Sequence, residues 1–149
     1  MSASPTYRAK VYKTEALVIR HQVLNDANKV LTLYSPQMGK LRVVAKGVLK
    51  PRSKLAGHIE PFTRISIMAS RGKNLDILSQ VNPLESFIDL RDDLFKTCEA
   101  LYVVELLDLF TKEEDPSPNL YNIALETLRG LIDANDGSLV LRQFELRLL

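Results

Sequence analysis

The residues best suited to do chemistry in this sequence are cations gathered between positions 46 and 54, which read KGVLKPRSK. Four of these nine residues are basic: Lys46, Lys50, Arg52 and Lys54. The only acid between Glu15 and Glu60 is Asp26. Because a folding chain gains little from crowding like charges, the cluster predicts contact with an anionic ligand. A solvated, solubilising loop is the alternative, since runs of like charge usually have that role.

The charge is also divided unevenly along the chain. Residues 1–80 contain 14 Lys and Arg against 4 Asp and Glu, whereas residues 81–149 contain 6 against 14. The two halves therefore carry +10 and −8, which the net charge of +2 conceals. The basic half has the electrostatic footprint of a nucleic-acid-binding domain. A basic subdomain that merely docks onto an acidic one would give the same division.

Motifs for catalysis or metal binding are not evident. The only imidazoles and thiol, on His21, His58 and Cys98, lack metal-ligand spacing, and Cys98 is expected in the core of a helical segment. Neither Gly-Lys pair, at Lys40 and Lys73, has the spacing of a phosphate-binding loop. The sequence therefore predicts a protein that is not an enzyme and has no metal or cofactor in this chain.

Composition indicates the compartment. No apolar run approaches the roughly 20 residues that span a bilayer, and the first residues, MSASPTYRAK, do not resemble a secretion signal. A single cysteine cannot form an internal disulfide, which is typical of a reducing compartment. We expect a cytoplasmic protein.

The basic half reads as five short strands. Alternating and β-branched apolar residues separated by Gly, Pro and Asn predict strands at 14–20, 29–35, 40–46, 62–69 and 75–82. Ser53 is expected to cap a short helical turn between the third and fourth strands. A helix at that place in a five-stranded barrel is the arrangement of the OB-fold, so residues 1–82 are predicted to form such a domain.

This fold binds oligonucleotides on the face of its second and third strands and through the adjoining loops. We therefore expect the nucleic-acid-binding residues to be Arg42, Lys46, Lys50, Arg52, Lys54, Lys29, Lys40, Arg71, Lys73 and Tyr34. Tyr34 is the candidate for stacking on a base, although aromatic side chains in small barrels are more often structural. The cations are the candidates for phosphate contacts.

The acidic half has helical periodicity, and residues 83–149 are predicted to form an incomplete helical domain. A helix over 89–111 is expected to begin at Asp89. Its apolar residues form one stripe of Leu94, Cys98 and Leu101 and an adjoining stripe of Phe95, Tyr102, Leu106 and Leu109, and Cys98 is expected in the core. Two further helices are expected to begin at Ser117 and at Ser138. The last pattern stops on two leucines without a capping glycine, so we expect the chain to be the N-terminal part of a longer protein.

Several segments in order resemble the bacterial RecO family of recombination-repair proteins. They are TEALVIR, ANKVLTLYSPQMGKLRVVAKGVLKPRSKLAGHIEPF, LESF, LYVVELLDLF and LRQFELRLL, and residues 39–62 are the most specific. The resemblance covers nearly the whole chain from about Thr14. It implies an N-terminal OB-fold, a helical domain and a nucleoid-associated repair mediator.

The resemblance also implies partners and activities. Such proteins bind single- and double-stranded DNA without a catalytic step, anneal complementary strands, and act with RecR and single-stranded-DNA-binding protein to help load RecA. Many relatives continue into a cysteine cluster that holds zinc, and this chain ends before any such residues. A second hypothesis is a protein-interaction adaptor whose basic barrel binds an acidic partner.

Overall fold

A closed five-stranded barrel occupies the N-terminal part of the computed structural model, which describes residues 10–149. The strands are β1 (Val11–Val23), β2 (Lys29–Ser35), β3 (Gly39–Ala45), β4 (Arg64–Ser70) and β5 (Asp76–Glu85). Their order around the barrel is β1-β2-β3-β5-β4, and β1 closes on β4. All pairs are antiparallel except β3 with β5, and the 3-10 turn η1 (Ala56–His58) lies between β3 and β4. The predicted OB-fold is confirmed.

The first strand is apolar on both faces because each face meets a different core. Ala16 and Val18 point into the barrel, while Leu17 and Ile19 belong to a second cluster shared with the helices. A strand buried on both sides reads as a continuous apolar run, which explains why simple alternation is lost here. β1 is therefore the strand on which the two parts of the molecule meet.

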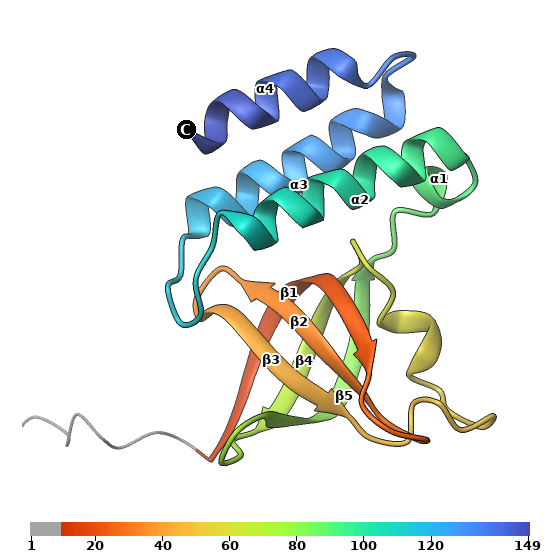
Figure 1. Ribbon diagram of the computed structural model, residues 1–149, viewed down its shortest axis with the longest axis vertical. Coiled ribbons are helices and arrows are strands. Elements are labelled where there is room, and N and C mark those ends of the chain that lie inside the picture. The colour runs from red at the N-terminus through yellow and green to blue at the C-terminus, as the bar shows by residue number, and fades with distance from the viewer. Residues whose placement is uncertain (1–9) are drawn as a thin grey trace, which may run out of the picture.

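Four helices follow the barrel and stack on one side of it (Figure 1). They are α1 (Ile88–Arg91), α2 (Leu94–Leu109), α3 (Pro118–Asp133) and α4 (Ser138–Leu148). α2 packs on β1, and α3 packs on β2. β5 runs to Glu85, three residues past the predicted domain boundary. None of the helices in residues 10–149 is long and apolar enough to cross a membrane.

The helix predicted over 89–111 is two helices. The chain breaks at residues 92–93, where the Asp93 carboxylate accepts hydrogen bonds from the amides of Phe95 and Lys96. Asp93, and not the predicted Asp89, therefore caps the long helix. Both are aspartates with the same capping chemistry, and the sequence alone did not distinguish them. The predicted start at Ser117 is confirmed, since its hydroxyl accepts a hydrogen bond from the Leu120 amide.

The face that α2 buries also differs from the prediction. Leu94 and Leu101 are 77% and 40% exposed, and Cys98 is exposed rather than in the core. The buried residues of α2 are Ala100, Val103, Val104 and Leu107. This helix carries apolar side chains on all of its faces, so the periodicity of the sequence could not determine which face packs against the barrel.

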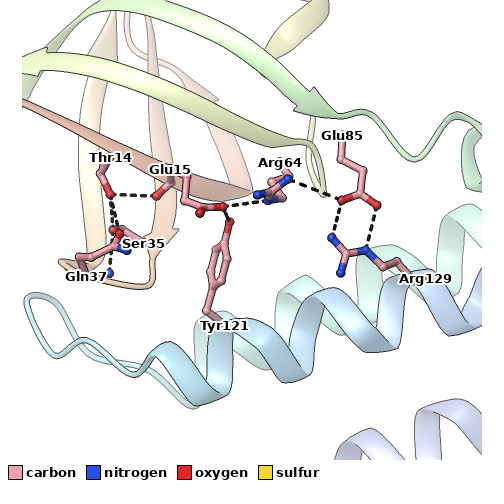
Figure 2. A network of polar contacts seen from close by, with 8 residues as sticks. All are labelled: Thr14, Glu15, Ser35, Gln37, Arg64, Glu85, Tyr121 and Arg129. Carbon is pink, nitrogen blue, oxygen red and sulfur yellow. Dashed lines mark hydrogen bonds and ion pairs between the residues drawn. The ribbon is translucent and has the colours of Figure 1, made fainter.

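A polar network ties the barrel to α3 (Figure 2). One carboxylate oxygen of Glu15 on β1 accepts hydrogen bonds from Arg64 Nε and from the Tyr121 hydroxyl, both at 2.8 Å. Arg129 binds both oxygens of Glu85, at 3.0 and 2.7 Å. Burial raises the pKa of Tyr121, and the hydrogen bond from Arg129 lowers the pKa of Glu85. These charge-assisted bonds fix the helices on one side of the barrel.

A further arginine closes the same interface just before β4 begins. The Arg91 guanidinium lies 3.9 Å from the ring centroid of Phe62 and donates to the Pro61 carbonyl and the Thr63 hydroxyl. Phe62 is buried, with a positive φ of 53°. The ring and the cation hold the chain where it enters β4.

Candidate nucleic-acid interface

The basic loop between β3 and η1 is anchored to the barrel by its apolar residues. Val48 is buried in the barrel core. The Gly47 amide donates to the Asn28 side chain at 2.8 Å, and the Leu49 amide donates to the Ala27 carbonyl at 3.0 Å. Gly47 has a φ of 70°, a conformation that glycine adopts without steric cost. These bonds hold the basic loop against the β1–β2 loop.

The cations of this loop point away from the anchor. Lys46, Lys50, Arg52 and Lys54 are all exposed. Lys29 stands opposite Ala45 in the β2–β3 ladder, and it therefore lies beside the start of the loop. Five predicted site residues are thus brought to one end of the barrel, the end opposite the helices in Figure 1. Asp26 is the one carboxylate in the neighbouring β1–β2 loop.

The β4–β5 turn carries two more of the predicted residues, and it lies beside the β2–β3 turn and the segment between α2 and α3. The Arg71 guanidinium lies 4.9 Å from the ring centroid of Tyr12, and Lys73 is exposed. Arg42 is exposed on β3 and, with Asn74 of this turn, lines a small hollow of about 130 Å³. Arg42 therefore connects the turn to the strand that leads into the basic loop.

Ion pairing separates the cations of the barrel into two groups. Those facing the helices are neutralised: Arg64 pairs with Glu15, Lys40 with Asp108, and Arg20 approaches Asp108 at 3.8 Å. Within residues 10–149, no carboxylate pairs with Lys29, Arg42, Lys46, Lys50, Arg52, Lys54 or Lys73. We call these seven residues the unpaired cation group. Their charge is available to an external anion.

Lys40 does not belong to this surface, which corrects its prediction as a binding residue. Its side chain is 12% exposed, and Nζ lies 2.7 Å from the Asp108 carboxylate. Nζ also donates to the main-chain carbonyls of Asp108 and Thr111, at the end of α2. A cation at the C-terminal end of a helix donates hydrogen bonds to the last main-chain carbonyls and interacts favourably with the helix dipole. Lys40 therefore joins the helices to the barrel.

Tyr34 is also structural, and the prediction that it stacks on a base is wrong. It is 0% exposed and packs 6.5 Å from the ring of Tyr121, centroid to centroid. Its hydroxyl accepts a hydrogen bond from the Ser117 amide, and burial raises its pKa. Helix α3 covers this end of β2, so the second strand is not open to a ligand as it is in a bare OB-fold.

Two polar residues near the basic surface were missed by sequence reasoning. Gln37 and Asn74, from the turns that precede β3 and β5, line a cleft beside Arg71 and Lys73. Both are uncharged turn residues, so their residue types did not indicate a position beside the basic surface. The cleft was detectable only after the fold had brought the two turns together.

The molecule is therefore an OB-fold barrel with a helical domain packed on one side and exposed cations on the other. The family model described as Recombination protein O N terminal matches residues 9–87, and that described as Recombination protein O C terminal matches residues 91–149. The chain therefore belongs to the RecO family.

Curated relatives agree with this assignment. The chain is 39% identical over 140 residues to the DNA repair protein RecO of Desulforamulus reducens, covering 94% of this chain and 54% of that protein. It is 42% identical over 142 residues to the DNA repair protein RecO of a Roseiflexus species, covering 95% and 50%. The chain thus spans about half the length of the curated relatives it matches.

Proposed function

We propose that this chain is the DNA-binding part of a recombinational repair protein, and that the unpaired cation group is its contact surface. The observation that carries the proposal is the division of the barrel cations. Those at the domain interface are neutralised by carboxylates, whereas those on the open side are not. Exposed cations without partners repel one another and contribute little to folding, so a polyanionic ligand accounts for them.

The mechanism is phosphate neutralisation. Lysine and arginine side chains release counterions from a nucleic acid, which gives affinity that is nearly independent of sequence and falls steeply with salt. Most of the unpaired cation group lies in loops and not on a helix inserted into a groove, and such contacts position a strand without reading its bases. Both single- and double-stranded DNA are therefore expected ligands.

Strand annealing follows from the same electrostatics. Two complementary strands repel each other through their phosphates, and a surface that screens both lowers that barrier. The proposed activity breaks no covalent bond and requires no cofactor, so the protein is not an enzyme. In the cell it would act on the bacterial nucleoid with RecR and single-stranded-DNA-binding protein to help load RecA.

The test is a fluorescence anisotropy titration with a labelled single strand at two salt concentrations. The proposal predicts tight binding at low salt and a steep loss of affinity as salt rises. The alternative is an adaptor that uses the same cations to bind an acidic partner, and a polyglutamate peptide is the corresponding probe. Negligible DNA affinity at low salt, with retained peptide binding, would favour the adaptor.

A further inference from the structure

Apolar side chains are exposed among the cations at the end of the barrel away from the helices. Val23 and Leu24, where β1 passes into the β1–β2 loop, are 66% and 50% exposed, and Leu49 of the basic loop is 38% exposed. We call these three residues the apolar tip. Isolated exposed apolar residues are common on protein surfaces, but these lie on two loops that are hydrogen-bonded to each other. Figure 1 shows the two loops beside each other at this end of the barrel.

Hydrogen bonds hold both loops in a defined conformation. The Leu24 amide donates to the Asn28 carbonyl at 2.9 Å, which closes the β1–β2 loop. Within that loop, the Asn25 side chain accepts hydrogen bonds from the amides of Ala27 and Asn28, both at 3.0 Å. The Leu49 amide donates to the Ala27 carbonyl, also at 3.0 Å. Because these loops are already ordered, a ligand that binds the apolar tip pays little for ordering them.

Cations of the unpaired cation group flank the apolar tip. Val23 stands opposite Lys29 in the β1–β2 ladder, and directly paired side chains lie on the same face of a sheet. Lys50 follows Leu49 directly in the basic loop. Asp26 is the one carboxylate of the two loops, and it is outnumbered by the cations. Apolar side chains among cations suit a ligand that presents apolar surfaces between anionic groups.

DNA is such a ligand, because the flat faces of its bases lie between its phosphates. Proteins that distort a duplex insert apolar side chains, leucine among them, between adjacent bases and partly unstack them. The lost stacking is offset by burial of the inserted side chain and by the contacts that the distortion allows. A single strand offers the same stacked steps without a paired strand to hold them together.

We infer that the apolar tip inserts between two adjacent bases of bound DNA and unstacks them. The inference rests on the proposed function, because the flanking cations must hold the phosphates on either side of the step. It assigns two roles to the same pair of loops. Their cations bind the strand, and their apolar side chains distort it.

The test uses 2-aminopurine, whose fluorescence is quenched by stacking and rises when the base is unstacked. The probe is a single strand of about ten nucleotides, which lies within the usual site size of one OB-fold. Deoxyadenosine and 2-aminopurine alternate along it, so every step contains the reporter. Saturating amounts of the 149-residue chain at low salt should raise the fluorescence of the strand.

Serine substitutions separate insertion from phosphate binding. The double variant Leu24→Ser and Leu49→Ser keeps every cation and should lose the fluorescence rise. Its affinity, measured by anisotropy, should stay within about tenfold of wild type, because the lost apolar burial is offset by stacking that is no longer disrupted. Leu139→Ser on α4 is the matched control, because that leucine is 68% exposed, and it should keep the full rise. Thermal unfolding should confirm that both variants are folded.

A second measurement does not depend on removing the leucines. The chain contains no tryptophan, so Leu24→Trp introduces a single indole at the apolar tip. Stacking of this indole on a base should quench its emission when an unmodified adenine strand binds. Leu139→Trp, on α4, should keep its emission.

Each outcome decides a different statement. A bound strand whose fluorescence does not rise, or a rise that persists in the double serine variant, would overturn insertion and leave the proposed function standing. Equal quenching of the two tryptophans would also overturn it. If the serine variant kept the rise but dissociated a dimer in sedimentation analysis, the apolar tip would be an interface between copies of the chain. Failure of the wild type to bind the strand at low salt would defeat the proposed function and the inference with it.

Discussion

Neutralising three cations of the basic loop should weaken DNA binding without unfolding the barrel. The triple variant is Lys46→Gln, Lys50→Gln and Arg52→Gln. All three side chains are exposed and none pairs with a carboxylate within the described residues, so the free energy of unfolding should change little. The neighbouring Lys54 and Lys29 remain, so the surface is reduced and not abolished.

The size of the effect follows from counterion release. Each phosphate contact contributes about 0.7 to the slope of log K against log salt for a single strand. Three lost contacts should reduce the slope by about 2, and at about 0.1 M salt the affinity should fall about 100-fold. The assay is fluorescence anisotropy with a labelled thymidine strand at four salt concentrations.

The matched control neutralises two cations on the opposite side of the molecule. Arg142→Gln and Arg147→Gln lie on α4, where the arginines pair with Glu145 and Glu126. This double variant changes the net charge in the same direction but should keep the wild-type slope. If the triple variant kept the wild-type slope, or if the control lost as much, the basic loop would not be the contact surface.

The remaining predictions concern the residues that join the two domains. Lys40→Met should destabilise the fold by about 1–3 kcal/mol, because it removes the close ion pair to Asp108 and leaves two carbonyls at the end of α2 without their donor. Urea unfolding should show this loss, while the salt slope of DNA binding stays unchanged. Tyr34→Phe should cost about 1 kcal/mol in the same assay, with DNA affinity retained; lost affinity in a folded variant would contradict its structural role. The lowered pKa of Glu85 stabilises the fold above the ordinary carboxyl pKa, and this contribution is lost as pH falls through the folded value. Arg129→Ala should therefore be less stable than wild type near pH 7, by about 0.5–1 kcal/mol, with the difference vanishing in acid; a deficit independent of pH would contradict this.

The barrel could be predicted from sequence because its strands carry local signals. The segment 29–35 was predicted with the same bounds as β2, and Pro36 and Gly39 marked the turn that follows. The position of the short turn η1 between the third and fourth strands then selected the OB-fold. These features depend on neighbouring residues, which a sequence shows directly.

The site could be predicted only in part, because pairing between distant residues is not visible in a sequence. Lys40 and Arg42 are alike as basic residues of one strand. Only the fold shows that Asp108, 68 residues away, neutralises the first and not the second. Tyr34 was misassigned for the same reason, since α3 covers it. An exposed stripe of α2 was mistaken for its buried face because this helix carries apolar side chains on all of its faces.

Lysine acetylation footprinting, with and without a saturating single strand, tests the unpaired cation group most directly. Mass spectrometry of each lysine should show protection by DNA at Lys46, Lys50 and Lys54. Lys112, exposed in the acidic linker, should remain as reactive as in the free protein. Equal protection of all four lysines, or protection of Lys112 alone, would contradict the assignment of DNA to the open side of the barrel.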